Sequence, residues 1–279
     1  MSAQASLLPD GKRLHLNHGP IDLIIDVNAA ARSIAYTLAV ARFETVLEEL
    51  VEELPFLRQM DTEHVFKGDV AQRMQAATKP LSQGFITPMA AVAGAVADEI
   101  LSALTPVPNL TKAHVNNGGD IAFYLAAGQS VIAALAGGRA TLHSNDPWRG
   151  VATSGWRGRS HSLGIADAVT VIAPSAATAD AAATLIANAV DLPAHPAILR
   201  RPATELSPDS DLNNRPVTVD VGPLSANDAA VALDRGAAVA DALVGRGLIG
   251  AAHLALNTQS RISGAALTLT PDQPELTHA

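Results

Sequence analysis

The chain has 279 residues, a formal net charge of −8 and no cysteine. Its length suits one large domain or two small ones. Without cysteine, disulfides, thiolate metal sites and a cysteine nucleophile are excluded. The 27 acidic residues outnumber the 19 basic ones and only 3% of residues are aromatic, which argues against a nucleic-acid partner.

Membrane insertion is not expected from the apolar segments. Two stretches lack charged residues, 80–97 and 121–138, but prolines, glycines and polar side chains interrupt both. The first residues show no basic segment followed by an apolar run, so no secretory signal is expected. We therefore expect a cytoplasmic protein. Hydrophobic residues make up 48% of the chain but aromatic residues only 3%. The core must therefore consist mainly of Ala, Val, Leu and Ile, packed with close backbone approach.

The first third of the chain predicts one strand and two helices. Apolar and β-branched residues at 19–27 are typical of a strand. Apolar residues then recur at helical intervals over 28–54, and Pro55 is expected to end that helix. A second helix, 88–104, is predicted to begin with Thr87 as its cap and carries an Ala/Gly-rich face.

The middle of the chain alternates strands and turns. Residues 113–126 predict two strands joined by a glycine-rich turn. A strand at 166–173 is followed by a helix over about 175–190. The polar, proline-rich stretch 193–216 is interpreted as a long ordered loop.

The last part predicts a strand at 215–221 and then a helix that begins with a capping box at Ser225 and ends near Val244. The segment 248–257 is expected to be the last strand, followed by a weakly ordered tail, 263–279. No charge block or linker marks a boundary. The sequence therefore predicts one α+β domain over 1–262.

Three local features carry candidate chemistry. The first is the glycine-rich turn, whose exposed backbone amides can bind an anionic or carbonyl-bearing ligand. It consists of Asn116, Asn117, Gly118, Gly119 and Asp120. An ordinary hairpin turn explains the same residues without a ligand.

The second feature is the segment 152–162, which gathers hydroxyls, arginines and a histidine around two glycines. Arg157 and Arg159 are suited to a phosphate or pyrophosphate. His161 is a candidate general base, although a lone histidine is more often structural. A solvated polar loop is the alternative interpretation.

The third feature is the pair Asp180 and Thr184, four residues apart on a predicted helix. Their oxygens lie on one side of that helix, one turn from each other. A carboxylate and a hydroxyl are hard ligands suited to Mg²⁺. The alternative is an acidic residue near a helix start followed by a helical threonine.

Taken in order, these features resemble the ApbE superfamily, and most closely its uncharacterised cytoplasmic branch in archaea and bacteria. The resemblance extends over most of the chain from about residue 10 to 262. Its matching segments are FITPMAAVAGAVADEI (85–100), VNNGGDI (115–121), RGVATSGWRGRSHSLGIADAVTVIA (149–173), ADAAATLIANAVD (179–191), PDSDLN (208–213) and VTVDVG (217–222).

This resemblance implies an α+β fold with two related halves, in which mixed or antiparallel sheets pack against Ala/Gly-rich helices. Family transferases use Mg²⁺ and FAD and transfer FMN to a protein threonine, and some relatives hydrolyse FAD. The family's N-x-G-G-D motif falls on 116–120, and its T-S-G loop falls on Thr153, Ser154 and Gly155. Its metal-binding motif falls on Ala179, Asp180 and Thr184.

The chain also departs from the family pattern. Ala93 stands where transferases carry a lysine, and Gly164 stands where an aspartate follows the histidine matched by His161. The P-x-T-G sequence that normally follows is missing. These departures leave His161 in a base-like position without its usual neighbours.

Three hypotheses follow. The first is an ApbE-like protein that binds a flavin (FAD or FMN) or another pyrophosphate-bearing nucleotide with Mg²⁺, with FMN transfer or FAD hydrolysis as its chemistry. The second is a non-catalytic accessory protein of sulfide assimilation in homocysteine synthesis, which Ala93 and Gly164 favour. The third is a structural subunit whose helix 88–104 packs against a second copy. A flavoprotein acceptor or a sulfur-assimilation protein is the corresponding partner.

Overall fold

The computed structural model describes residues 2–60, 63–81, 84–135 and 138–265. A nine-stranded sheet organises this part of the chain, and each of its strand pairs is antiparallel. In spatial order the sheet consists of β1 (Gln4–Leu7), β2 (Leu14–His18), β3 (Ile21–Val27), β4 (Lys112–Asn117), β5 (Asp120–Leu125), β8 (Gly150–Ser154), β9 (Ala168–Ala173), β12 (Ala251–Leu256) and β13 (Gln259–Ser263).

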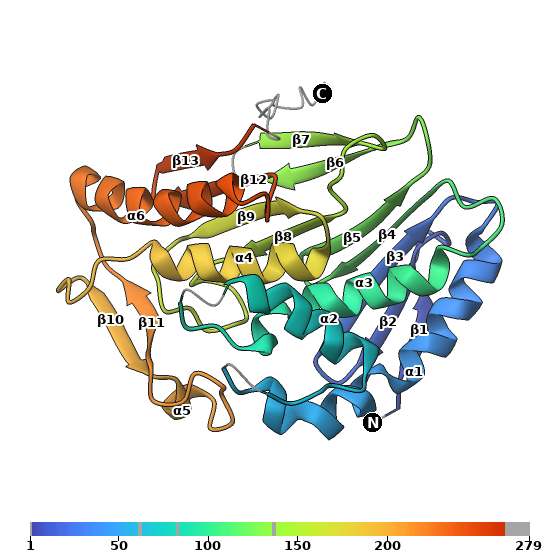
Figure 1. The fold of residues 1–279 in the computed structure, drawn as a ribbon, viewed down its shortest axis with the longest axis horizontal. Helices are drawn as coiled ribbons and strands as arrows, with labels where there is room; N and C mark the ends of the chain where they lie inside the picture. The colour runs from blue at the N-terminus through green and yellow to red at the C-terminus, as the bar shows by residue number, and fades with distance from the viewer. Residues whose placement is uncertain (1, 61–62, 82–83, 136–137, 266–279) are drawn as a thin grey trace.

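Helices cover one face of this sheet (Figure 1). They are α1 (Arg32–Leu57), α2 (Asp69–Thr78), α3 (Val92–Leu104), α4 (Ala176–Ala189) and α6 (Ala226–Gly245), with 3-10 turns η1 (Lys79–Leu81) and η2 (Pro88–Ala91). Two separate hairpins complete the architecture, β6 (Ser130–Leu135) with β7 (Gly138–His143), and β10 (Ile198–Pro202) with β11 (Pro216–Val221), the latter pair joined through α5 (Ala203–Leu206). The predicted α+β class is confirmed.

Small residues allow the helices to approach one another closely, as the composition predicts. A Cβ added to Gly94 of α3 would lie 2.2 Å from the backbone oxygen of Ala176 at the start of α4. Only glycine fits such a contact. The Ala/Gly-rich surface that could have served a second copy therefore packs within this chain.

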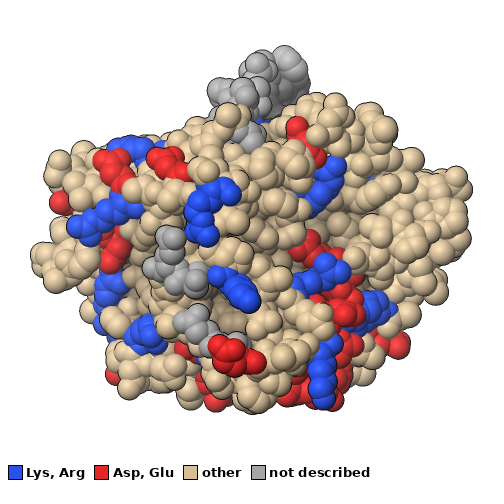
Figure 2. Space-filling view, viewed as in Figure 1, with Lys and Arg blue, Asp and Glu red and all other residues tan. Residues whose placement is uncertain are grey.

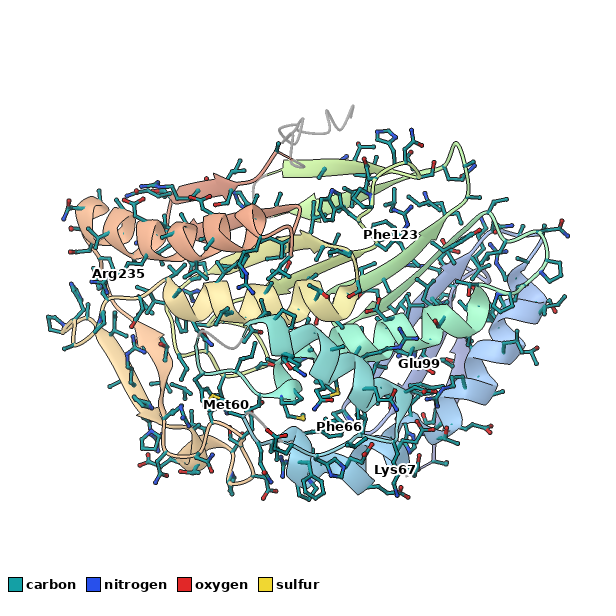
Figure 3. The ribbon with its side chains drawn as sticks, viewed as in Figure 1. Met60, Phe66, Lys67, Glu99, Phe123 and Arg235 are labelled. Atoms are coloured by element: carbon teal, nitrogen blue, oxygen red, sulfur yellow. The ribbon has the colours of Figure 1, made fainter. Side chains whose placement is uncertain are left out.

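An ion network around one buried carboxylate also ties three helices together. Glu99 of α3 accepts hydrogen bonds from Arg42 Nε of α1 at 2.7 Å and from Arg73 Nε of α2 at 2.9 Å. The Glu99 side chain is labelled in Figure 3, on α3. Because both carboxylate oxygens have a charged partner, this buried acid is fully paired.

The opposite face of the sheet is packed differently. Strand residues alternate between the two faces, so Phe123 of β5 and Ile172 of β9 point away from the helices and into a second core under the β6–β7 hairpin. Leu142 of β7 closes this core from the hairpin side and is buried.

Several sequence predictions are wrong in detail. Pro55 does not end α1, because the helix continues to Leu57, which is fully buried. The proline lacks a backbone N–H, so the helix loses the one hydrogen bond that residue 55 would donate to the carbonyl of Val51. Thr87 does not cap the next helix with its hydroxyl, and that helix begins as the 3-10 turn η2.

The C-terminal part needs further corrections. The stretch 193–216 is not a plain loop, since it contains β10 and α5, and β10 pairs with β11 in a hairpin separate from the main sheet. β12 is not the last strand, because β13 pairs with it after a tight turn at Asn257. Of the expected tail, 266–279 lies outside the described residues, and the domain limits stay a prediction. None of the helices in the described part of the chain is long and apolar enough to cross a bilayer.

Candidate functional site

A cavity of about 500 Å³ lies where α3 and α4 meet the ends of the central strands. Its walls come from η2, the start of α3, the β4–β5 turn, the loop after β8, the middle of α4, and the segment that joins α5 to β11. On the face drawn in Figure 2 the surface is hollowed near its centre, with acidic and basic side chains close to the hollow. Segments far apart in the sequence therefore share one site.

The start of α4 is fixed by two capping side chains. Ser175 Oγ accepts a hydrogen bond from the amide of Thr178 at 3.1 Å, as an N-cap does. Asp98 of α3 accepts from the amides of Ala176 and Ala177 at 3.0 and 2.9 Å. These contacts hold α4 against α3 and so set the position of the residues one turn further along.

Asp180 and Thr184 both line the cavity from α4. Asp180 Oδ2 accepts a hydrogen bond from the backbone amide of Gly94 at 3.0 Å. The glycine that permits the close approach of α3 and α4 therefore also orients the carboxylate.

A second carboxylate, Asp120, reaches the same cavity from the first residue of β5. Its Oδ1 accepts from the Thr153 amide at 3.3 Å. Burial raises the pKa of Asp120 to about 7, although the Thr153 amide and the charge of Arg159 oppose this rise. Burial, and then the negative charge of Asp120, raise the pKa of Asp180 well above its ordinary value. Two carboxylates that oppose each other's ionisation are stabilised by a cation placed near both.

The β4–β5 turn is built on glycines in the left-handed region. Gly118 and Gly119 have φ values of +64° and +115°, and Asn116 Oδ1 accepts from the Gly119 amide at 2.8 Å. Asn117 turns inward, where its Nδ2 donates to the Ala93 carbonyl at 3.0 Å. Asn117 and Gly118 line the cavity, whereas Asn116 and Gly119 do not.

Arg159 lies directly over this turn. A Cβ added to Gly118 would come within 2.4 Å of a guanidinium nitrogen of Arg159. In the described part of the chain, the Arg159 side chain forms no hydrogen bond or ion pair of its own. Its charge is therefore available to an anionic ligand.

Some residues of the loop after β8 line the cavity, whereas others lie outside it. Thr153, Ser154 and Gly155 line the cavity. Arg157 does not, because it pairs with Asp167 through Nε at 3.2 Å and stacks on the Trp156 ring at 4.3 Å.

His161 also lines the cavity, and its Nε2 lies 3.0 Å from Ser207 Oγ. Gly164, where the family pattern has an aspartate, packs against the C-terminal end of α4. A Cβ there would lie 2.0 Å from the Ala187 carbonyl oxygen. No side chain can be accommodated at 164, which excludes an aspartate there. In the described part of the chain, His161 contacts the hydroxyl of Ser207 instead.

Sequence reasoning missed a further part of the cavity lining. Arg58, just past the C-terminal end of α1, gave no local signal. The stretch 208–213 resembled the family, but its residues had no assigned role. The additional lining residues include Arg58, Met89, Ser207, Asp209, Ser210, Asp211 and Leu212.

The residues present fit a magnesium ion in part. Across the described ranges, no group of three or more His, Cys, Asp and Glu side chains could hold a metal. Asp180, Asp120 and the Thr184 hydroxyl offer oxygen donors only, and Mg²⁺ commonly completes such a set with water and substrate phosphate. The chemistry of this donor set therefore suits Mg²⁺ and does not suit a closed zinc site.

Comparison with known proteins adds the following relatives. A UPF0280 protein of Methanococcoides burtonii is 34% identical over 168 residues, which are 56% of this chain and 67% of the relative. A UPF0280 protein of Methanopyrus kandleri is 40% identical over 127 residues, which are 43% of this chain. The chain spans only about half of the latter protein, 48% of its length.

Two solved structures are similar at low identity. The apo form of the flavinyl transferase ApbE of Pseudomonas stutzeri gives a TM-score of 0.45 at 12% sequence identity. The match covers 94% of this chain and 92% of the Pseudomonas chain. A variant of the flavin transferase ApbE from Vibrio cholerae gives a TM-score of 0.46 at 14% sequence identity, and the match covers 90% of this chain and 97% of the Vibrio chain. The family described as AbpE bacteria matches residues 5–262. Because this match spans nearly the whole chain, the protein belongs to that ApbE-like family.

Proposed function

We propose that this protein binds a flavin nucleotide, or another pyrophosphate-bearing nucleotide, together with Mg²⁺ in the cavity between α3 and α4. The observation that carries the proposal is that charged side chains from three separate segments line one cavity. They are Asp120, Asp180 and Arg159. Two carboxylates for a cation and a guanidinium for a phosphate are what binding a magnesium pyrophosphate requires.

Each group has a distinct task in this proposal. Asp180 and Thr184 hold the metal ion, and Asp120 adds negative charge beside it. Mg²⁺, when bound, neutralises the phosphate charge, which is the main requirement of phosphoryl-type transfer. Arg159 binds a phosphate oxygen over Gly118, where the absence of a side chain leaves room for its guanidinium.

His161 lines the cavity wall and takes a proton, as general base, during FMN transfer or FAD hydrolysis in this proposal. Its contact with Ser207 Oγ orients the imidazole ring. Membership of the ApbE-like family supports flavin as the ligand. A flavoprotein is then the acceptor of the transferred group.

The second candidate is an accessory protein, for instance in sulfide assimilation, that binds the ligand without turnover. Ala93 favours it, because a methyl group lines the cavity where the related transferases carry a lysine. Gly164 favours it too, because the close contact with α4 excludes the aspartate that would accompany His161.

Titration of the protein with FAD, with and without Mg²⁺, tests both candidates. Flavin fluorescence reports binding, and AMP release reports cleavage of the pyrophosphate. We expect saturable binding that requires Mg²⁺, and its loss in Asp180→Asn without a change in circular dichroism. AMP release from FAD alone identifies a hydrolase, and AMP release that requires an added flavoprotein acceptor identifies a transferase. Binding without AMP release in the presence and absence of an acceptor identifies the accessory protein. Unchanged affinity of Asp180→Asn would refute the metal site.

A further inference from the structure

Ser207 contacts an imidazole inside the cavity. Its Oγ lies 3.0 Å from His161 Nε2, and both residues line the cavity. In the tautomer that carries its proton on Nδ1, the imidazole accepts a hydrogen bond from the serine hydroxyl through Nε2. A serine hydroxyl within hydrogen-bond distance of an imidazole is the arrangement in which serine acts as a nucleophile. The contact therefore has a chemical use beyond orienting the histidine.

The backbone on both sides of Ser207 fixes the position of its hydroxyl. Ser207 directly follows α5, and its amide donates to the Ala203 carbonyl at 2.8 Å. The Ser207 carbonyl accepts a hydrogen bond from the Ser210 amide at 3.0 Å. Because both backbone polar groups of Ser207 are paired, its side chain has little freedom to move away from His161.

The residues that follow His161 are anchored as well. The Leu163 amide donates to Asn188 Oδ1 on α4 at 2.9 Å. The Ser162 carbonyl accepts from the Thr218 amide on β11 at 2.9 Å. Since α4 also carries the proposed metal ligands, the imidazole and the metal site are positioned by the same helix.

The other hydroxyls of the cavity are placed differently. Ser210 Oγ accepts a hydrogen bond from the Leu212 amide at 3.3 Å, and Thr153 Oγ1 lies 2.9 Å from Thr170 Oγ1. In the described part of the chain, Ser207 carries the one cavity hydroxyl within hydrogen-bond distance of an imidazole. This contrast distinguishes Ser207 from the hydroxyls around it.

Two cationic side chains, Arg58 and Arg159, line the same cavity from other segments. Neither has an ion-pair partner in the described ranges. A phosphoryl group is anionic and repels a nucleophile, and cations placed beside it lower the barrier to attack. The cavity therefore holds a hydroxyl, a base and cations, which are the groups that nucleophilic attack on phosphorus requires.

We propose that Ser207 is a nucleophile that forms a covalent phosphodiester with the pyrophosphate nucleotide bound in the cavity. Ser207 Oγ attacks one phosphorus, so that a new O–P bond forms and the bond from this phosphorus to the bridging oxygen breaks. The hydroxyl proton moves to His161 Nε2, and the bridging oxygen leaves with the bonding electrons as part of a nucleoside monophosphate. With FAD, AMP leaves and FMN stays attached to the chain. Addition of water across this phosphodiester releases FMN and regenerates the serine.

This inference rests on the proposed function, because it assigns the group that first accepts the phosphoryl group in the same cavity. It differs from transfer to a flavoprotein in that the acceptor belongs to this chain. A covalent adduct on Ser207 forms without any second protein.

Mass spectrometry of the intact chain tests the inference. The unmodified protein, Ser207→Ala, His161→Gln and Thr204→Ala are mixed with FAD and Mg²⁺ without an acceptor protein, and samples are quenched in acid at successive times. Intact mass reports covalent flavin, peptide mapping locates it, and chromatography measures AMP. Thr204→Ala is the matched control, because Thr204 carries a hydroxyl on α5, contacts Asn214 and does not line the cavity. Fluorescence titration measures the FAD affinity of each variant, and circular dichroism reports its folding.

We expect the unmodified protein and Thr204→Ala to gain the mass of one FMN less one water at residue 207, with AMP released as the adduct forms. Ser207→Ala should bind FAD with similar affinity and form no adduct. His161→Gln should form the adduct at least roughly 100-fold more slowly, the effect typical of losing a general base. If Ser207 only orients His161, none of the proteins acquires covalent flavin.

Absence of covalent flavin from the unmodified protein at every time would overturn the inference. An adduct at another residue, or one that persists in Ser207→Ala, would overturn it too. In each of these cases, Mg²⁺-dependent binding of FAD by the unmodified protein leaves the proposed function standing. If the unmodified protein binds no FAD, the proposed function and this inference fail together.

Discussion

The two faces of the nine-stranded sheet are packed by different means. On the helical face, glycine brings the backbones of α3 and α4 into contact, as at Gly94, and large side chains such as Phe43 and Leu104 fill the rest of the core on that face. On the other face, side chains such as Phe123 and Leu142 fill the space beneath the β6–β7 hairpin. Backbone-to-backbone contact leaves no freedom for adjustment, whereas side chains can repack. The candidate site lies beside the backbone contact of α3 and α4, where binding groups are held most rigidly.

Gly94→Val is expected to have the largest effect, because it disrupts the close backbone contact between α3 and α4. Its Cβ would lie 2.2 Å from the Ala176 oxygen, so α3 and α4 must separate. We expect a loss of more than about 4 kcal/mol in the free energy of unfolding, measured in urea. Gly245→Val at the end of α6, with no atom within 4 Å of its added Cβ, is the control and should change little. Similar small losses in both variants would show that α3 and α4 can move apart.

Phe123→Ala tests the other face. Phe123 is 2% exposed in the second core, and its truncation should cost about 3 kcal/mol of unfolding free energy. We expect the affinity for FMN with Mg²⁺ to be unchanged at temperatures where the variant remains folded. A drop in affinity that follows the drop in stability would mean that the two faces are coupled through the sheet.

Arg159 and Arg157 allow a comparison within one loop. Arg159→Ala should lower the affinity for pyrophosphate with Mg²⁺ roughly 10- to 100-fold, because a hydrogen bond to a charged group contributes about 1.5–3 kcal/mol. Arg157→Ala should have little effect, because Arg157 pairs with Asp167 outside the cavity. Isothermal titration calorimetry measures both. Equal losses would assign the anion to the loop's overall charge instead of to the side chain over Gly118.

The smallest effect is expected from His253 on β12, which is 2% exposed. Burial lowers the pKa of this imidazole below its ordinary value of 6.5. The unfolded chain therefore binds a proton at His253 that the folded chain does not bind. The free energy of unfolding falls as the pH drops below about 6.5. In His253→Leu, urea denaturation between pH 7 and pH 5 should show a shallower decline than in the unmodified protein. Parallel declines would show that His253 accepts its proton without unfolding.

Local patterns predicted much of the fold. The capping box of Ser225 and Asp228, the Gly118-Gly119 turn and the helix carrying Asp180 all occur where the sequence placed them. Each depends on contacts between residues close in sequence. The strand missed within 193–216, β10, depends on a partner strand instead, since in the described part of the chain β10 pairs only with the predicted strand β11. Likewise, Pro55 is tolerated because Leu57 gains burial in the core.

The amino-acid sequence by itself determined the α+β class, the family resemblance and the residue types of the candidate site, because those depend on composition, short periodicities and motifs. It also determined that the core would be small-residue packed. Only the tertiary structure decided that Asp120 and Asp180 influence each other's ionisation, that Arg159 lies over Gly118 while Arg157 points away, and that Asp209 shares their cavity. These relations join residues tens of positions apart. Their distances are set by how α3, α4 and the strands pack, which no local pattern encodes.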